Sequence, residues 1–150
     1  MRNIEEYPHA FVLACLMDTG VDADVARTIP YRVSEALGTF ELQELDKVSA
    51  EQYAEMFNGE KKWHRYPARN AKFFYDGVHK IFDNEFMNGD ASRIWSGKPS
   101  SRDVILRFMD FNGCGFKVAN MAWFIIAFSR LSILSSENSY GPFEFEKRHL

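Results

Sequence analysis

Two glycines separated by one residue, Gly113 and Gly115, constrain the fold of this chain more than any other feature. Glycine tolerates positive φ and lets another part of the chain approach its backbone closely, so the pair predicts a tight turn. Backbone amides in such a turn, next to a helix N-terminus, can bind phosphate. Lys117 would lie in the first turn of that helix, where the dipole disfavours a cation. Catalysis or phosphate binding would explain the lysine, and a close helix–helix corner with an exposed lysine is the alternative.

The residues before the glycines predict a helix that ends close to the turn. Ser100 and Asp103 form a variant of the capping box at its start. One face of the helix and the turn carries three apolar residues: Val104, Phe108 and Phe111. A second apolar segment follows at 118–128. The order helix, glycine turn, helix is the helix-hairpin-helix arrangement.

Residues 111–120 read Phe-Asn-Gly-Cys-Gly-Phe-Lys-Val-Ala-Asn. This stretch resembles the hairpin of the helix-hairpin-helix DNA glycosylases, the endonuclease III-like superfamily, which typically reads Leu-Pro-Gly-Val-Gly-x-Lys-Thr-Ala-Asn. Asn112 replaces the usual proline and Val118 the usual threonine, while five positions match: Gly113, Gly115, Lys117, Ala119 and Asn120. The resemblance covers roughly residues 8 to 128. It is closest to a poorly characterised branch that shares the Ile-Trp-Ser-Gly-x-Pro-Ser-Ser stretch at 94–101.

The resemblance implies an all-α, glycosylase-like helical bundle or barrel and a role in DNA base-excision repair. In bifunctional members of the family, the lysine that matches Lys117 attacks the sugar C1′, releases the base and forms a Schiff base. The family also places an aspartate after this lysine, and Glu137 is the only carboxylate here between Asp110 and Glu144. Lys117 and Glu137 are therefore the predicted catalytic residues. A phosphate contact or a vestigial residue is the alternative for Lys117, and a non-catalytic DNA-binding or interaction module is the alternative function.

The rest of the chain also predicts helices, with no alternating pattern that would indicate a sheet. The expected helices are 8–18, 23–37 capped by Asp22 and kinked at Pro30, a short one capped by Thr39, one with a Ser49–Gln52 capping box, 67–86, a short one ending near Trp95, one before the glycines, and 118–128.

The net charge of −3 conceals an uneven distribution. Residues 1–60 hold 4 Lys/Arg against 12 Asp/Glu, whereas residues 61–130 hold 12 against 6. Nucleic acid requires one basic face rather than a basic chain. The expected duplex-DNA contacts are the hairpin, Gly113, Cys114 and Gly115, and a basic cluster, Lys61, Lys62, Arg65, Arg69 and Lys72. A solvated helix start is the alternative for the cluster, and a structural role is the alternative for His64.

Three further observations bear on chemistry and location. The two cysteines, Cys15 and Cys114, lack partner motifs, which predicts no metal site, no cofactor and no disulfide framework, and favours a reduced cytoplasmic protein. The family's four-cysteine iron–sulfur loop has no counterpart in this chain. No signal peptide or membrane span is expected. The aspartates of 18–24 are best explained by helix capping, and their charge would repel phosphates.

The chain is expected to form one helical domain over 1–130 and an irregular tail over 131–150. Turn-forming residues predict a loop at 135–142, and the rest of the tail is either weakly ordered or docked by Phe143 and Phe145. The segment 118–128 is apolar nearly all round, which indicates a buried core helix. The resemblance implies covering helices that this chain lacks, so we expect either a homodimer or a tail that folds back as a lid.

Overall fold

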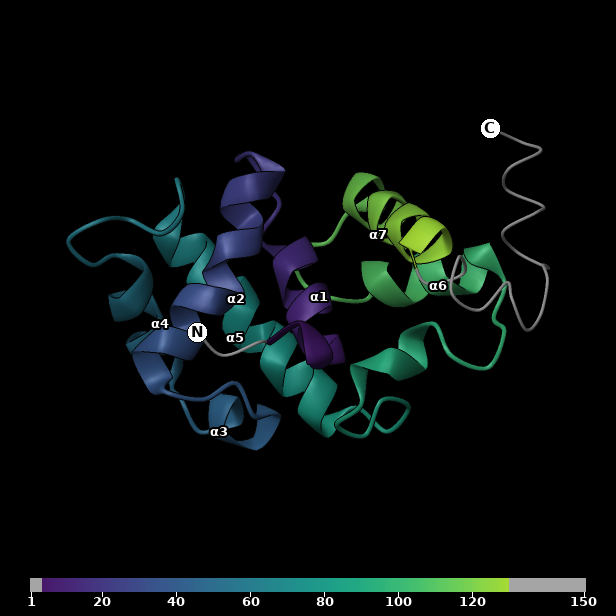
Figure 1. The fold of residues 1–150 in the computed structure, drawn as a ribbon, viewed down its shortest axis with the longest axis horizontal. Helices are drawn as coiled ribbons and strands as arrows, with labels where there is room; N and C mark the ends of the chain where they lie inside the picture. The colour runs from purple at the N-terminus through teal and green to yellow at the C-terminus, as the bar shows by residue number, and fades with distance from the viewer. Residues whose placement is uncertain (1–3, 130–150) are drawn as a thin grey trace.

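The computed structural model describes residues 4–129, and the regular secondary structure of these residues is entirely helical, with no strand among them (Figure 1). The all-α prediction is therefore confirmed for this part of the chain. The elements in order are η1 (Ile4–Glu6), α1 (Pro8–Leu16), α2 (Ala23–Leu37), α3 (Leu42–Asp46), α4 (Ala50–Phe57), α5 (Pro67–Asp83), η2 (Ala91–Ile94), α6 (Ser101–Met109) and α7 (Phe116–Ser129).

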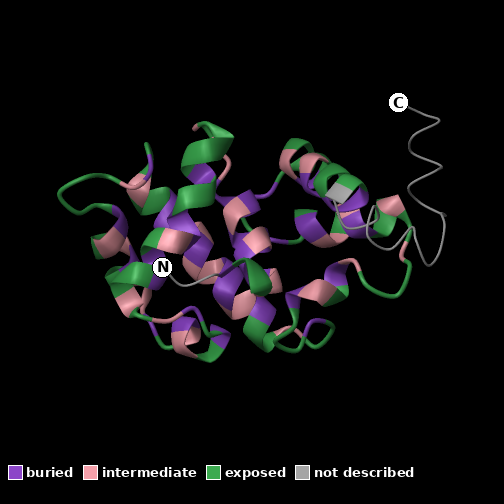
Figure 2. Ribbon diagram, viewed as in Figure 1, coloured by how far each residue is buried: buried purple, intermediate pink, exposed green. Residues whose placement is uncertain are grey.

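Helix α1 lies at the centre of the fold, in contact with α2, α5, α7 and both 3-10 turns. Figure 1 shows α2, α3 and α4 on one side of it and α6 and α7 on the other. Its sequence suits that place, because apolar residues surround the helix and six of its nine residues are buried. A helix that is apolar all round is typically found inside a protein core. In Figure 2 the buried residues of α1 and its neighbours lie in the middle of the molecule.

Helix α5 is the longest element among the described residues and contacts α1, α3 and α4. Its buried residues repeat at helical spacing: Asn70, Ala71, Phe74, Gly77, Val78 and Ile81. At Gly77 a Cβ would lie 2.7 Å from Leu16 Cδ1 and 3.1 Å from Leu13 Cδ2. Because glycine has no side chain there, α1 can cross α5 at this close distance.

Most predicted helix boundaries are confirmed within two residues. The Ser49 hydroxyl accepts a hydrogen bond from the Gln52 amide, and the Gln52 side chain accepts one from the Ser49 amide, which completes the predicted capping box. Helix α2 runs through Pro30 and ends at Leu37, with Gly38 as its C-cap at a φ of 74°. Asp22 occupies the N-cap of α2 but makes no side-chain capping bond.

Two boundary predictions are wrong. The helix expected to reach Phe86 ends at Asp83, because the Asn84 side chain accepts hydrogen bonds from the amides of Phe86 and Met87 and turns the chain. The short third helix begins at Leu42 with Glu41 as its N-cap, while the hydroxyl of Thr39, two residues before the N-cap, accepts a hydrogen bond from the Glu41 amide. In both cases a short polar side chain bonds to nearby backbone and stops or delays the helix.

Helix α7 corrects the prediction of a fully buried core helix. Its inner face packs on α1 and α6 through Ala119, Ala122, Trp123, Ile126 and Ala127. Its outer face exposes Phe116, Phe124, Ile125 and Phe128. The sequence is apolar all round, but no helix among residues 4–129 covers the outer face.

The predicted tail, 131–150, and its Glu137 lie outside the described residues. Among residues 4–129, no helix has the length and apolar character needed to cross a membrane.

Candidate nucleic-acid interface

The glycine hairpin packs tightly against one aromatic ring of α5. Gly113 has a φ of 87°, which the absence of a side chain permits. A Cβ at this position would lie 2.6 Å from Cδ2 of Phe73, so the ring occupies the space that any other side chain would need. Gly115 differs, because a Cβ there would meet nothing within 4 Å. The hairpin therefore has one side fixed on α5 and one side open.

Polar contacts hold the same hairpin on α5. The Asn112 side-chain amide donates to Oδ2 of Asp76 at 3.1 Å, and Lys72 Nζ donates to Oδ1 of Asp76 at 2.6 Å. Lys80 Nζ lies 2.6 Å from Oδ2 of Asp110, at the end of α6. These contacts link two sequence-distant segments, α5 and residues 110–112, so the hairpin cannot move independently of α5 without breaking charged hydrogen bonds.

Cationic and aromatic side chains alternate from the start of α5 towards the hairpin. We call Arg65, Tyr66, Arg69 and Phe73 the arginine–aromatic row. The guanidinium carbons of Arg65 and Arg69 lie 5.5 Å and 4.4 Å from the Tyr66 ring centroid, and that of Arg69 lies 5.9 Å from the Phe73 centroid. Because Phe73 also contacts Gly113, the row joins the basic cluster to the hairpin.

The buried side chain of His64 holds the backbone of the arginine–aromatic row in place at Tyr66. His64 is 2% exposed, and its Nε2 lies 2.9 Å from the carbonyl of Met17. Its Nδ1 accepts from the Tyr66 amide at 3.0 Å, which places the ring proton on Nε2 and makes that nitrogen the donor to Met17. Burial lowers the pKa of His64, with Arg69 adding to the effect against the opposing Met17 bond. His64 is therefore neutral and structural, one of the two roles considered from the sequence.

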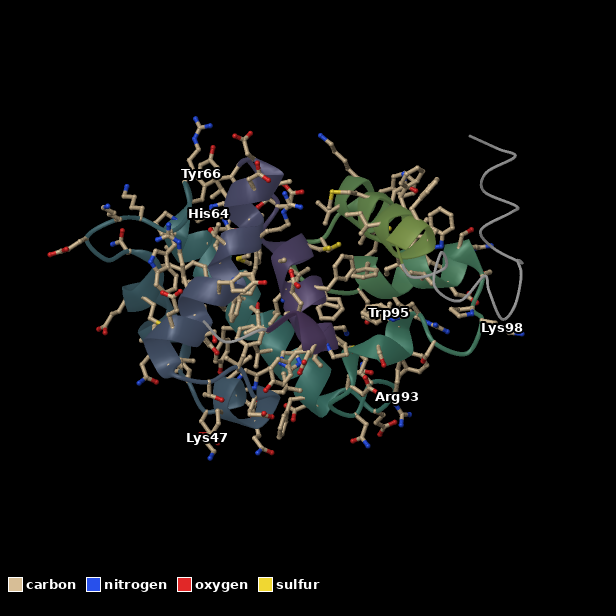
Figure 3. The ribbon with its side chains drawn as sticks, viewed as in Figure 1. Lys47, His64, Tyr66, Arg93, Trp95 and Lys98 are labelled. Carbon is tan, nitrogen blue, oxygen red and sulfur yellow. The ribbon has the colours of Figure 1, made fainter. Side chains whose placement is uncertain are left out.

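The neighbouring Asn70 and Thr19 complete this support. Asn70 is fully buried and donates to the Tyr66 carbonyl at 3.0 Å, while its Oδ1 accepts from the Thr19 hydroxyl at 3.1 Å. Arg69 donates to the same hydroxyl at 3.2 Å. The loop after α1 is thus hydrogen-bonded to the start of α5, and Tyr66 packs over Gly20. Figure 3 shows His64 and Tyr66 together at this edge of the molecule.

Lys117 lies in the first turn of α7, at the place the sequence predicts. Its side chain is exposed, and no ion pair within residues 4–129 includes it. The amide of Ala119 donates to the Gly115 carbonyl, which is the first turn of hydrogen bonding in the helix. The preceding amides of a helix have no intrahelical acceptor and carry partial positive charge. Lys117 and these amides form a cationic end beside the open side of the hairpin.

The structure brings most of the predicted interface residues into one connected set. Gly113, Gly115 and Lys117 lie at the hairpin, and Arg65, Arg69 and Lys72 reach it through α5. Lys61 and Lys62 are exposed in the preceding loop, and no contact among the described residues joins them to the hairpin. The Cys114 side chain is buried, and burial raises the pKa of its thiol to about 11. Only the backbone of Cys114 is therefore available to a ligand.

Sequence reasoning missed the residues that make the connection: Tyr66, Phe73, Asn112, Asn70 and Thr19. The spacing of Arg65, Arg69 and Phe73 at every fourth residue was a usable signal, because such residues lie on one face of a helix. The partners of Asn70 and Asn112 lie 51 and 36 positions away, so no local pattern could reveal them.

An acidic segment borders this interface. Asp18, Asp22 and Asp24 flank Thr19 and Gly20, which contact Arg69 and Tyr66. Asp24 forms an ion pair with Arg27 on α2. These carboxylates limit the positive surface on the α2 side, so the accessible cations are those of the row, the preceding loop and Lys117.

The other titratable side chains among the described residues do not form a metal site. Within residues 4–129 no group of three His, Cys, Asp or Glu residues could hold a metal ion. Cys15 is buried, and burial together with the nearby Cys114 thiol raises its pKa. His79 lies 3.0 Å from Asp46 and ties α5 to α3.

No protein-family model, curated protein or solved structure matches this chain. The resemblance to the helix-hairpin-helix glycosylases therefore stays a prediction, and the geometry of the site is the basis for function.

Proposed function

We propose that this chain is a helix-hairpin-helix domain that binds the phosphate backbone of duplex DNA, as the resemblance to the glycosylase superfamily implies. One observation carries the proposal: the Phe73 ring contacts both Gly113 and Arg69, so the hairpin and the basic cluster form one surface. Free amides at the start of α7 and exposed cations beside them suit phosphate oxygens. Such contacts position a protein on DNA without reading its sequence.

The charges of the surface favour this ligand. Arg65, Arg69 and Lys117 have no carboxylate partner among the described ion pairs. Lys72 is already paired with Asp76, so it has less free charge to offer. Because each arginine lies against an aromatic ring, its position is restricted before a ligand arrives. Restriction in advance lowers the entropy lost on binding.

The test is fluorescence anisotropy with a labelled duplex of mixed sequence at low salt. Arg69→Ala and Lys117→Ala should together weaken binding by at least about tenfold, which corresponds to about 1.4 kcal/mol. The double variant Lys47→Ala/Arg93→Ala removes the same charge from the edge of the molecule away from His64 and Tyr66 in Figure 3 and should bind as the wild type does. Equal weakening in both double variants, or no binding by the wild type, would remove the proposal.

A second candidate function, abasic-site lyase chemistry, is favoured by the exposed and unpaired position of Lys117 within the described residues. The unprotonated Nζ would add to the aldehyde carbon of an opened abasic sugar and lose water to give an imine. The imine then promotes β-elimination of the 3′ phosphate, and hydrolysis frees the lysine. Against this candidate, the side chain of Lys117 is exposed and no pocket among the described residues encloses it.

Borohydride trapping on abasic duplex tests the lyase separately from binding, because it reduces the imine to a stable amine. Lys117→Arg keeps the positive charge but cannot form the imine, so it should bind DNA and fail to trap. Binding without trapping by the wild type would identify the non-catalytic module. Excision of an intact base further needs a carboxylate against the developing sugar cation. Glu137 is the candidate from the sequence, and loss of excision in Glu137→Gln would assign it.

A further inference from the structure

A groove of about 380 Å³ lies on the side of the molecule where η1, α1 and α2 meet η2 and α7. Its wall is mainly apolar, with Ile4, Phe11, Tyr31, Trp95, Ile125 and Ile126 among the lining residues. The volume falls within the range of about 300 to 1,000 Å³ that is typical of ligand sites. None of these residues belongs to the arginine–aromatic row or the hairpin. The groove is therefore a second surface feature, separate from the proposed DNA interface.

The apolar wall continues onto the exposed face of α7. Ile125 lines the groove and is still 39% exposed, and the rings of Phe124 and Phe128 lie 4.3 Å apart beside it. This surface leads to Ser129, the last residue of α7. Helix α7 therefore ends close to the groove.

We propose that residues 142–148 of the same chain bind in this groove. The segment reads Pro-Phe-Glu-Phe-Glu-Lys-Arg. In an extended chain, alternate side chains point to opposite sides, so Phe143 and Phe145 share one side and Glu144 and Glu146 share the other. The two phenylalanine rings pack against the apolar wall, and the two carboxylates face solvent.

The length of the intervening segment permits this contact. Thirteen residues separate Ser129 from Phe143, and an extended chain spans up to about 3.3 to 3.6 Å per residue, or about 45 Å in all. Helix α7 itself has 14 residues and is only about 21 Å long at 1.5 Å per residue. A tethered segment also has an effective concentration in the mM range. The tethered segment therefore outcompetes a second copy of the chain or a free partner of similar affinity.

The charges at the groove match the segment. Glu5 and Glu6 line the groove, with Glu5 hydrogen-bonded to Tyr31, and the lining residue Arg27 pairs with Asp24. The segment carries Lys147 and Arg148 directly after its apolar pair. With the phenylalanines in the groove, the two cations reach the acidic rim at η1.

A nitroxide label at Ser139→Cys on the full chain tests the proposal. Labelling should be selective, because Cys15 and Cys114 are buried free thiols. We expect the label to broaden the amide resonances of Phe11, Tyr31 and Trp95 and to leave those of α4, on the other side of α1, unchanged. Phe143→Ala/Phe145→Ala should abolish the broadening. The matched pair Glu144→Ala/Glu146→Ala changes the opposite side of the segment and should preserve it.

Three outcomes would overturn the proposal. The first is an absence of broadening at the groove in the otherwise unchanged chain. The second is broadening that survives Phe143→Ala/Phe145→Ala or is lost equally in the glutamate pair. The third is broadening that arises only between molecules, which mixed isotope-labelled and nitroxide-labelled samples reveal and which would assign the groove to a homodimer. The amide spectrum of residues 4–129 shows in each sample that the domain is folded.

Discussion

Gly113 fixes the position of the hairpin through two separate constraints. Its φ of 87° disfavours any residue with a side chain, and the Phe73 ring fills the space a Cβ would take. Gly38, at the end of α2, has a φ of 74° but open space around it. Gly38 is therefore constrained by its backbone conformation alone, whereas Gly113 is constrained by both its conformation and its packing.

Substitution by alanine measures both constraints. Gly38→Ala should lower the free energy of unfolding by roughly 1 to 2 kcal/mol, because a non-glycine residue in the left-handed region costs about that much. Gly113→Ala should lower it further by roughly 1 to 3 kcal/mol, the usual effect of overpacking. Urea unfolding of both variants gives the difference. Equal losses in the two variants would mean that the contact with Phe73 contributes nothing.

His64 makes stability depend on pH. Burial lowers its pKa in the folded state below the unfolded value of 6.5, and the same holds for buried His9. Below pH 6.5 the unfolded chain therefore binds more protons than the folded chain, and the free energy of unfolding falls. The full contribution is present above pH 6.5, and each histidine can lower stability by at most about 1.4 kcal/mol per pH unit.

His64→Gln should flatten this dependence between pH 7.5 and 5.5 and leave the part due to His9. Thermal unfolding across that range measures the change. Should the variant fail to fold, an NMR titration of the wild-type ring replaces it. A His64 ring that protonates at or above pH 6.5 would contradict the buried, neutral assignment.

At the scale of elements, helix content was predictable and helix exposure was not. Capping residues such as Ser49 and Ser100 act within a few positions, so their helices could be located from sequence. The apolar segment 118–128 was expected to be buried on all sides, yet α7 exposes Phe124 and Phe128. Periodicity reports which residues could be buried. It does not report whether the chain supplies another element to cover them.

In the candidate site, too, the local features were predictable from the sequence and the contacts between distant residues were not. Glycine spacing and the density of Lys and Arg located the hairpin and the basic cluster separately. Their connection depends on Phe73 packing under Gly113 and on Asn112 bonding to Asp76, contacts between residues 36 or more positions apart. Such contacts follow from the folded arrangement of α5 and α6, which a single sequence does not encode locally.

Phe73→Ala should weaken DNA binding although it removes no charge. Without the ring, the hairpin loses its packing partner and Arg69 loses one aromatic contact. We expect a loss of about fivefold in affinity, equivalent to about 1 kcal/mol. Phe82→Ala, on the same helix but more exposed, is the matched control and should bind normally. Unchanged affinity in Phe73→Ala would mean that the hairpin and the row act independently.

At the scale of the whole molecule, the uneven charge distribution has a structural counterpart. The acidic first 60 residues form η1 and α1 to α4, and the basic residues that follow begin in the loop before α5. Helices α1, α3 and α4 pack on α5, and the α1–α2 loop contacts the start of α5 at Tyr66 and Arg69. A polyanion would therefore approach the α5 and hairpin side, while the α2 side repels it.

The salt dependence of duplex binding tests the central claim most directly. Each phosphate contact adds about 0.9 to the slope of log affinity against log salt. If Arg69 and Lys117 each neutralise one phosphate, Arg69→Ala/Lys117→Ala should reduce the slope by about 1.8 relative to the wild type. Lys47→Ala/Arg93→Ala should leave it unchanged. A slope that does not change in the first variant, or that falls equally in both, would contradict the assignment of this surface to the DNA backbone.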